Sequence, residues 1–87
     1  MKQGDLARDR YGRIVMIGKS RNDAGDPLTL VIYPPMLHMP VETAGGSGAF
    51  SKWTLTSNLT EVGDVTEHLR MPYMSEWYYK TRRALMG

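Results

Sequence analysis

The chain has 87 residues, 41% of them hydrophobic and 23% charged, and carries a formal net charge of +2 at pH 7. This length predicts one domain near the lower limit for an independent core, which buries roughly 60–65% of its unfolded surface. The chain contains no cysteine, which excludes disulfides and thiolate zinc sites and is typical of a reducing compartment. The polar first residues do not resemble a signal peptide, and no run approaches the roughly 20 apolar residues of a membrane span. We therefore expect a cytoplasmic protein.

Two strands joined by a tight turn are expected at the start of the chain. Residues 3–9 form the first strand, with Leu6 pointing inward, and Gly12 can take the positive φ of a hairpin turn. Residues 13–19 (RIVMIGK) form the second strand, in which apolar side chains point to both faces. A strand of this kind is covered on both sides and lies in the centre of a sheet. Gly18 is a candidate for a β-bulge.

The middle of the chain predicts an exposed loop, a strong strand and a long connection. Residues 20–27 are rich in turn formers and should form the loop. Residues 28–33 (LTLVIY) form the clearest strand, because β-branched and aromatic residues dominate it. Pro34 and the following proline end it by removing two backbone donors. In the Pro- and Gly-rich connection at 34–50, the apolar first part should fold over one end of the sheet and the glycine-rich second part should form a flexible hairpin tip. The first part carries three candidate contact residues: Met36, Leu37 and Met39.

Two more strands are expected before the C-terminal segment. In residues 52–56, Trp53 and Leu55 alternate with polar residues and should point inward. Residues 59–62 predict a last short strand or a 3₁₀ turn. We therefore expect residues 1–63 to form a mainly-β domain.

The first strand and turn read Gly4-Asp5-Leu6-Ala7-Arg8-Asp9 and Tyr11-Gly12-Arg13, and the closing segment runs from Trp53 to Val62. These stretches resemble the SH3-like small β-barrels found in short bacteriophage proteins. The resemblance covers residues 3–63 and implies an SH3-like small barrel of about five strands with a C-terminal helical segment. It also implies a binding or assembly role, in a host cytoplasm or in a virion, but identifies no ligand. In the closing segment, Val62 stands one residue later than the barrel pattern has it, so a bulge is expected there.

Residues 64–87 form the second expected unit, a helical arm. Asp64 stands where an N-cap would, with Glu67 three residues later, and a first helical turn should run to about Arg70. Pro72 should then interrupt or kink the helix. Beyond it, helical spacing predicts one face with Met74, Trp77, Tyr78, Thr81 and Leu85, and an opposite face with Glu76, Tyr79, Lys80 and Arg83.

Residues 65–87 of the arm carry the whole formal net charge of the chain and four of its eight aromatic residues. Aromatic and arginine side chains are enriched where proteins bind partners, since they bury large areas and make directional polar contacts. The candidate partner-binding residues of the arm are therefore Tyr73, Trp77, Tyr78, Tyr79, Lys80, Arg82 and Arg83.

Three interpretations of this arm remain open. Its Trp77 face can complete the core of the small domain. It can instead dock on another protein, which is a host or virion component or a second copy of the chain. As a third possibility, its rings stack on bases while its cations bind phosphates, in transcription or genome packaging. The small basic excess favours a protein partner over nucleic acid, and no membrane or small-molecule substrate is expected.

No constellation of residues indicates catalysis. His38 and His68 lie 30 residues apart, and neither has the partners at defined spacing that a catalytic or metal site needs. We therefore expect a non-catalytic protein without a metal or another cofactor.

Overall fold

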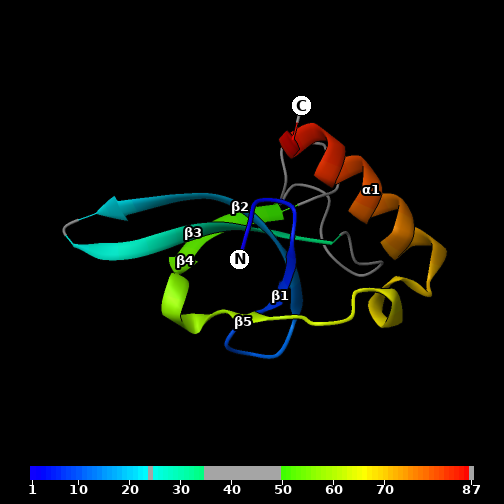
Figure 1. The fold of residues 1–87 in the computed structure, drawn as a ribbon, viewed down its shortest axis with the longest axis horizontal. Helices are drawn as coiled ribbons and strands as arrows, with labels where there is room; N and C mark the ends of the chain where they lie inside the picture. The colour runs from blue at the N-terminus through cyan, green and yellow to red at the C-terminus, as the bar shows by residue number, and fades with distance from the viewer. Residues whose placement is uncertain (24, 35–49, 87) are drawn as a thin grey trace.

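The computed structural model describes residues 1–23, 25–34 and 50–86 (Figure 1). In these residues, five strands form one sheet: β1 (Leu6–Arg8), β2 (Ile14–Asp23), β3 (Asp26–Tyr33), β4 (Phe50–Leu55) and β5 (Thr60–Glu61). The remaining elements are two 3₁₀ helices and one α-helix: η2 (Thr56–Asn58), η3 (Thr66–Leu69) and α1 (Pro72–Met86). The expected combination of a β-sheet and a C-terminal helical segment is confirmed.

All neighbouring strands are antiparallel, in the order β4-β3-β2-β1-β5. β5 is two residues long, and it pairs with β1 through Ala7 opposite Glu61 and Arg8 opposite Thr60. In the part of the chain that the structure describes, no pairing joins β5 to β4, so these two strands are the open edges of the sheet. The sheet therefore does not close into the expected barrel, because the short last strand offers β4 no partner.

β2 is the central strand, and both of its faces are buried. Val15 and Ile17 belong to a core cluster on one face, which consists of Ala7, Val15, Ile17, Val31, Tyr33 and Leu59. Met16 belongs to the cluster on the other face, where Leu6, Met16, Met74, Trp77 and Tyr78 pack together beneath α1. The alternation of apolar side chains in β2 predicted this two-sided burial, and the structure confirms it.

β2 bends at Gly18, where its pairing with β3 changes register. Ile17 pairs with Val31 and Ser20 pairs with Thr29, so β2 has one extra residue between these two pairs. A Cβ atom at position 18 would lie 3.1 Å from the carbonyl oxygen of Leu30, so a larger residue would require the neighbouring strand to shift by a few tenths of an ångström. The expected bulge is confirmed, and close approach of the two backbones explains why glycine occupies it.

We expect Gly18→Ala to lower the free energy of unfolding by about 1–2 kcal/mol, because the added methyl group must displace a backbone carbonyl. Urea denaturation followed by circular dichroism measures this change. Gly63→Ala is the matched control, since no atom lies within 4 Å of a Cβ at that position. The control should change stability by less than about 0.5 kcal/mol, and equal effects of the two substitutions would contradict the steric explanation.

The prediction of a loop at residues 20–27 is wrong. β2 continues to Asp23 and β3 begins at Asp26, with Arg21 paired to Leu28. The ladder of hydrogen bonds in this long hairpin outweighs the turn propensity of the single residues and confines the turn to the tip. Figure 1 shows the hairpin projecting from the rest of the molecule, which agrees with the predicted exposure of this segment.

The inward orientation expected for Trp53 and Leu55 is also wrong. Trp53 is 37% exposed and Leu55 is 43% exposed. They pair with Leu30 and Leu28, in a part of the sheet that lies outside both core clusters. The Arg21 guanidinium lies 4.2 Å from the centre of the Trp53 ring, so this ring packs against a cation. Alternation predicts that two residues share a face, but it does not predict which face becomes the core.

The chain forms two separate helical segments at its C-terminal end. Asp64 Oδ1 accepts a hydrogen bond from the Thr66 N–H at 3.0 Å, and η3 that follows is a 3₁₀ helix. α1 begins at Pro72. Proline lacks a backbone N–H, but at the first position of a helix this group would have no helical acceptor, so its absence costs no hydrogen bond. Ser75 Oγ donates to the Leu69 carbonyl oxygen at 2.6 Å and ties the two segments together. The interruption predicted at Pro72 is confirmed.

Candidate functional site

The inner face of α1 is part of the core. Met74, Trp77 and Tyr78 are 9%, 5% and 8% exposed and pack against Leu6 and Met16. Two of the rings that the sequence offered as partner contacts, Trp77 and Tyr78, are therefore occupied within the chain itself. On this face the first of the three interpretations, completion of a small core, describes the structure.

The opposite face of α1 is open, and an exposed ring and two exposed cations lie near its C-terminal end. Tyr79 is 58% exposed and Met86 is 60% exposed. Arg82 and Arg83 are also exposed. These four side chains line a shallow hollow of about 230 Å³, and we call them the C-terminal patch.

Contacts within the chain hold the C-terminal patch in place. The Tyr79 ring meets the Tyr78 ring edge-on, with centres 5.1 Å apart. The Arg82 guanidinium lies 5.9 Å from the centre of the same Tyr78 ring. Gln3 Nε2 donates to the Leu85 carbonyl oxygen at 3.4 Å, so the N-terminal segment supports this end of the helix. A surface ordered in this way loses less conformational entropy when a partner binds.

Tyr73 and Lys80 are exposed but do not belong to the C-terminal patch. Tyr73 is 40% exposed and lies six residues before Tyr79, about 9 Å away along the helix axis. Lys80 Nζ lies 3.8 Å from Glu76 Oε1, and both side chains are largely exposed. A pair of this kind contributes little to stability, but it partly neutralises the cation. The remaining predicted contact residues, Met36, Leu37 and Met39, lie outside the described residues.

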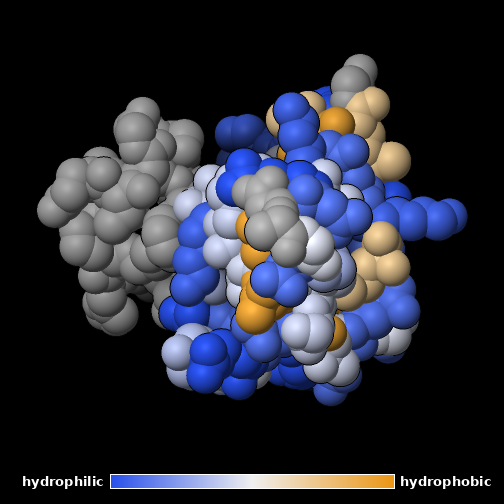
Figure 2. All heavy atoms as spheres, turned by 90° about the vertical axis from the view of Figure 1, so that its left-hand side faces the viewer, coloured by the Kyte–Doolittle hydropathy of each residue, from blue (hydrophilic) through white to orange (hydrophobic). Residues whose placement is uncertain are grey.

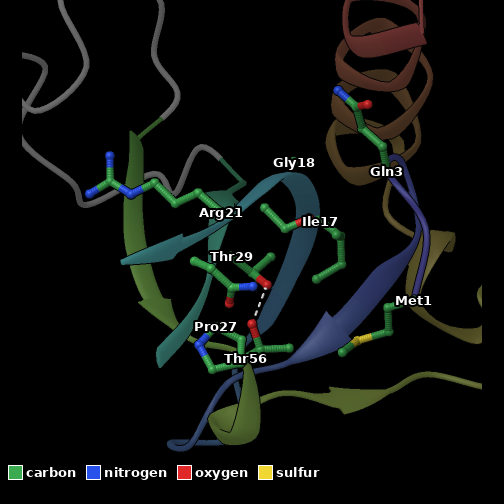
Figure 3. Close-up of a pocket in the computed structure, with 10 residues that line it drawn as sticks. Met1, Gln3, Ile17, Gly18, Arg21, Pro27, Thr29 and Thr56 are labelled. Carbon is green, nitrogen blue, oxygen red and sulfur yellow. Dashed lines mark hydrogen bonds between the residues drawn. The ribbon is translucent and has the colours of Figure 1, made fainter. Parts of the chain in front are cut away.

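A second hollow of about 440 Å³ lies between the N-terminal segment and the β2–β3 hairpin. Figure 3 shows Ile17 and Gly18 beside it, and a hydrogen bond of 2.8 Å between Thr29 Oγ1 and Thr56 Oγ1. The side chain of Arg21 extends away from this pair of hydroxyls. Seen toward the hairpin tip, the surface is mainly hydrophilic, with hydrophobic side chains in a narrow band (Figure 2). The described residues that line the hollow include no histidine, cysteine, aspartate or glutamate side chain.

A buried carboxylate that sequence reasoning did not single out organises the β1–β2 turn. Asp9 is 8% exposed. Its Oδ1 accepts hydrogen bonds from the N–H groups of Tyr11 and Arg13, at 2.9 and 2.8 Å. Its Oδ2 accepts from Arg13 Nε at 2.8 Å and from the Tyr33 hydroxyl at 3.0 Å. Gly12 adopts a φ of 81° in this turn, as the sequence predicted.

The protonation of Asp9 follows from these contacts. Burial acts to raise its pKa, but the hydrogen bonds from Arg13, Tyr33 and Tyr11 outweigh burial and hold the pKa below its ordinary value. Burial and the hydrogen bond to this carboxylate raise the pKa of the Tyr33 hydroxyl. Asp9 is therefore an ionised structural acceptor at neutral pH, and the phenol beside it stays protonated.

The described residues contain no group of three or more histidine, aspartate or glutamate side chains that could hold a metal ion. None of the helices in the same ranges is long and apolar enough to cross a membrane. Comparison of the chain with protein-family models, with curated proteins and with solved structures found no match.

Proposed function

We propose that this chain is a non-catalytic interaction module that binds another protein chain through the exposed side of α1. The observation that supports this proposal best is the division of α1 into two faces. The inner face anchors the helix in the core, while the C-terminal patch keeps Tyr79, Arg83 and Met86 exposed. Tyrosine and arginine are frequent anchors of protein interfaces, and a methionine adapts to an irregular apolar partner.

The charge of the C-terminal patch indicates the kind of partner. Arg82 and Arg83 bring two cations beside the Tyr79 ring, and the patch itself contains no carboxylate. We propose an acidic protein surface with an apolar recess for the tyrosine ring. In a multi-chain assembly such as a virion, that surface belongs to a neighbouring component or to a second copy of this chain.

We also propose that the sheet is an open variant of the SH3-like small barrel. The bend of β2 at Gly18 curls the sheet, and the cluster around Val15 combines residues of β1, β2 and β3 with Leu59 before β5. An interior that gathers side chains from most strands in this way is typical of small barrels. The proposal is consistent with a binding role, although the fold by itself identifies no ligand.

A photo-crosslinking amino acid at position 79 tests the protein partner directly. In cells that make the protein together with its natural neighbours, we expect position 79 to form a covalent adduct with a protein chain. The mass of the adduct distinguishes a second copy from a different component. Position 11 is the matched control, because Tyr11 is also an exposed tyrosine, at 66% exposure, and lies on the β1–β2 turn. Adducts of equal yield at both positions, or no adduct at position 79, would contradict the proposal.

Nucleic-acid binding remains the alternative function. Binding to phosphates weakens steeply between low and physiological salt, whereas an interface anchored by aromatic residues changes little.

A further inference from the structure

Cations lie against two aromatic rings around the β1–β2 turn, the exposed Tyr11 and the buried Tyr33. The guanidinium carbons of Arg10 and Arg13 each lie 5.2 Å from the centre of the Tyr11 ring. Arg13 also lies 4.8 Å from the centre of the Tyr33 ring, and Lys52 Nζ lies 5.9 Å from that centre. We call these five side chains the turn cluster. In Figure 1 the β1–β2 turn lies at the opposite end of the molecule from the C-terminus of α1.

The turn cluster concentrates positive charge. Its cations are Arg10, Arg13 and Lys52, and Arg8 joins them through a hydrogen bond of 3.1 Å from Nη1 to the Gly12 carbonyl oxygen. The carboxylate that lies among them is the buried Asp9, whose oxygens accept four hydrogen bonds. The resulting excess of three positive charges is larger than the formal net charge of +2 of the whole chain. The other side chains together are thus slightly acidic, and a polyanion is attracted to this end of the molecule.

The β1–β2 turn fixes the position of one exposed ring, that of Tyr11. Tyr11 is 66% exposed, and its backbone N–H is bound by Asp9. Arg13 is tied to the same carboxylate through its backbone and its side chain, so it cannot move far from the turn. Arg10 is exposed, and among the described residues its side chain makes no hydrogen bond or ion pair of the kind that holds Arg13. Arg10 can therefore leave the Tyr11 ring for a phosphate while the ring stays in place.

We propose that the turn cluster binds single-stranded nucleic acid, with a base stacked on Tyr11 and phosphates on Arg8, Arg10 and Lys52. Stacking of a base on an aromatic ring contributes more than an exposed contact between a guanidinium and a ring, so replacing Arg10 on the ring by a base is favourable. The displaced guanidinium then binds the adjacent phosphate, which satisfies both groups. This site is separate from the C-terminal patch and does not depend on the function proposed for it.

Fluorescence anisotropy with a labelled oligothymidylate tests the site at low salt. We expect Tyr11→Ala to weaken binding about tenfold and Tyr11→Phe to change it less than about twofold, because phenylalanine keeps the stacking surface. Arg10→Ala combined with Lys52→Ala should weaken binding and reduce the salt slope of log K by about 1.4, the value for two phosphate contacts on a single strand. The matched control is Lys80→Ala combined with Arg83→Ala, which removes the same charge from α1. It should leave binding within about twofold of the wild type.

Heparin, a polyanion without bases, separates stacking from charge. We expect Tyr11→Ala to bind heparin as the wild type does, while the Arg10 and Lys52 variant binds it more weakly. The inference is overturned if the wild type does not bind oligothymidylate at low salt, if Tyr11→Ala binds it normally, or if the α1 control weakens binding as much as the turn variant. Circular dichroism of each variant confirms folding, and Asp9 and Arg13 are left unchanged because they hold the turn.

Discussion

Trp77→Ala is expected to destabilise the protein by about 3–5 kcal/mol, a large part of the total stability of a domain of this size. Trp77 is 5% exposed and lies in the core cluster between α1 and the sheet. Its removal leaves a cavity that the neighbouring Leu6 and Met16 cannot fill. Urea denaturation followed by circular dichroism measures the loss.

Two further substitutions control this prediction. Tyr79→Ala removes an aromatic ring from the exposed face of the same helix and should cost less than about 0.5 kcal/mol. Trp77→Phe keeps much of the volume and removes an indole N–H that has no hydrogen-bond partner among the described residues. It should therefore cost much less than the alanine substitution. If the free energy of unfolding of Trp77→Ala lies within about 1 kcal/mol of the wild-type value, α1 is not anchored in the core through Trp77.

Asp9→Asn is expected to lower the free energy of unfolding at pH 7 by about 2–3 kcal/mol, because buried hydrogen bonds to a charged acceptor are lost. The effect depends on pH in a direction that follows from the depressed native pKa of Asp9. The carboxylate stabilises the fold at pH values above its ordinary pKa of 3.8. Its contribution falls as the pH drops through that value toward the lower native pKa, and it is absent below both.

Unfolding free energies of wild type and Asp9→Asn, measured between pH 7 and pH 2, test this dependence. The difference between the two proteins should be constant near neutral pH and should shrink on acidification below about pH 4. Asp26→Asn is the control at an exposed position in the β2–β3 hairpin, where we expect a change of less than about 0.5 kcal/mol at pH 7. A difference that stays the same down to pH 2 would mean that Asp9 stabilises the turn without its charge.

Local patterns in the sequence predicted the elements whose burial depends on their own periodicity. The alternation in β2 indicated a strand covered on both faces, and the spacing in α1 separated Trp77 and Tyr78 from Tyr79 and Arg83. The glycines at 12 and 18 marked a turn and a bulge, because Gly12 adopts a positive φ and Gly18 lies close to the backbone of Leu30. The strand and helix faces were predictable because side chains on one face recur every two residues in a strand and every three to four in a helix.

Other predictions failed where pairing between distant segments decides the outcome. The hairpin at residues 20–27 forms because β2 and β3 pair along its length, which overrides the turn propensity of its residues. Trp53 pairs with Leu30 in a part of the sheet that neither core cluster includes, so its ring stays partly exposed. Closure of the barrel requires pairing between the first and last strands of the sheet, and in the described residues the two-residue β5 pairs only with β1.

The amino-acid sequence by itself determined a small, cysteine-free, mainly-β domain with an amphipathic C-terminal helix, since composition and periodicity are properties of neighbouring residues. Tertiary structure alone decided that Trp77 and Tyr78 belong to the core while Tyr79 and Met86 stay exposed. It also brought Asp9, Arg13, Tyr33 and Lys52 together from two strands and the β1–β2 turn. The physical reason is strand register, which brings residues far apart in the chain within a few ångströms of one another and leaves no mark on local spacing.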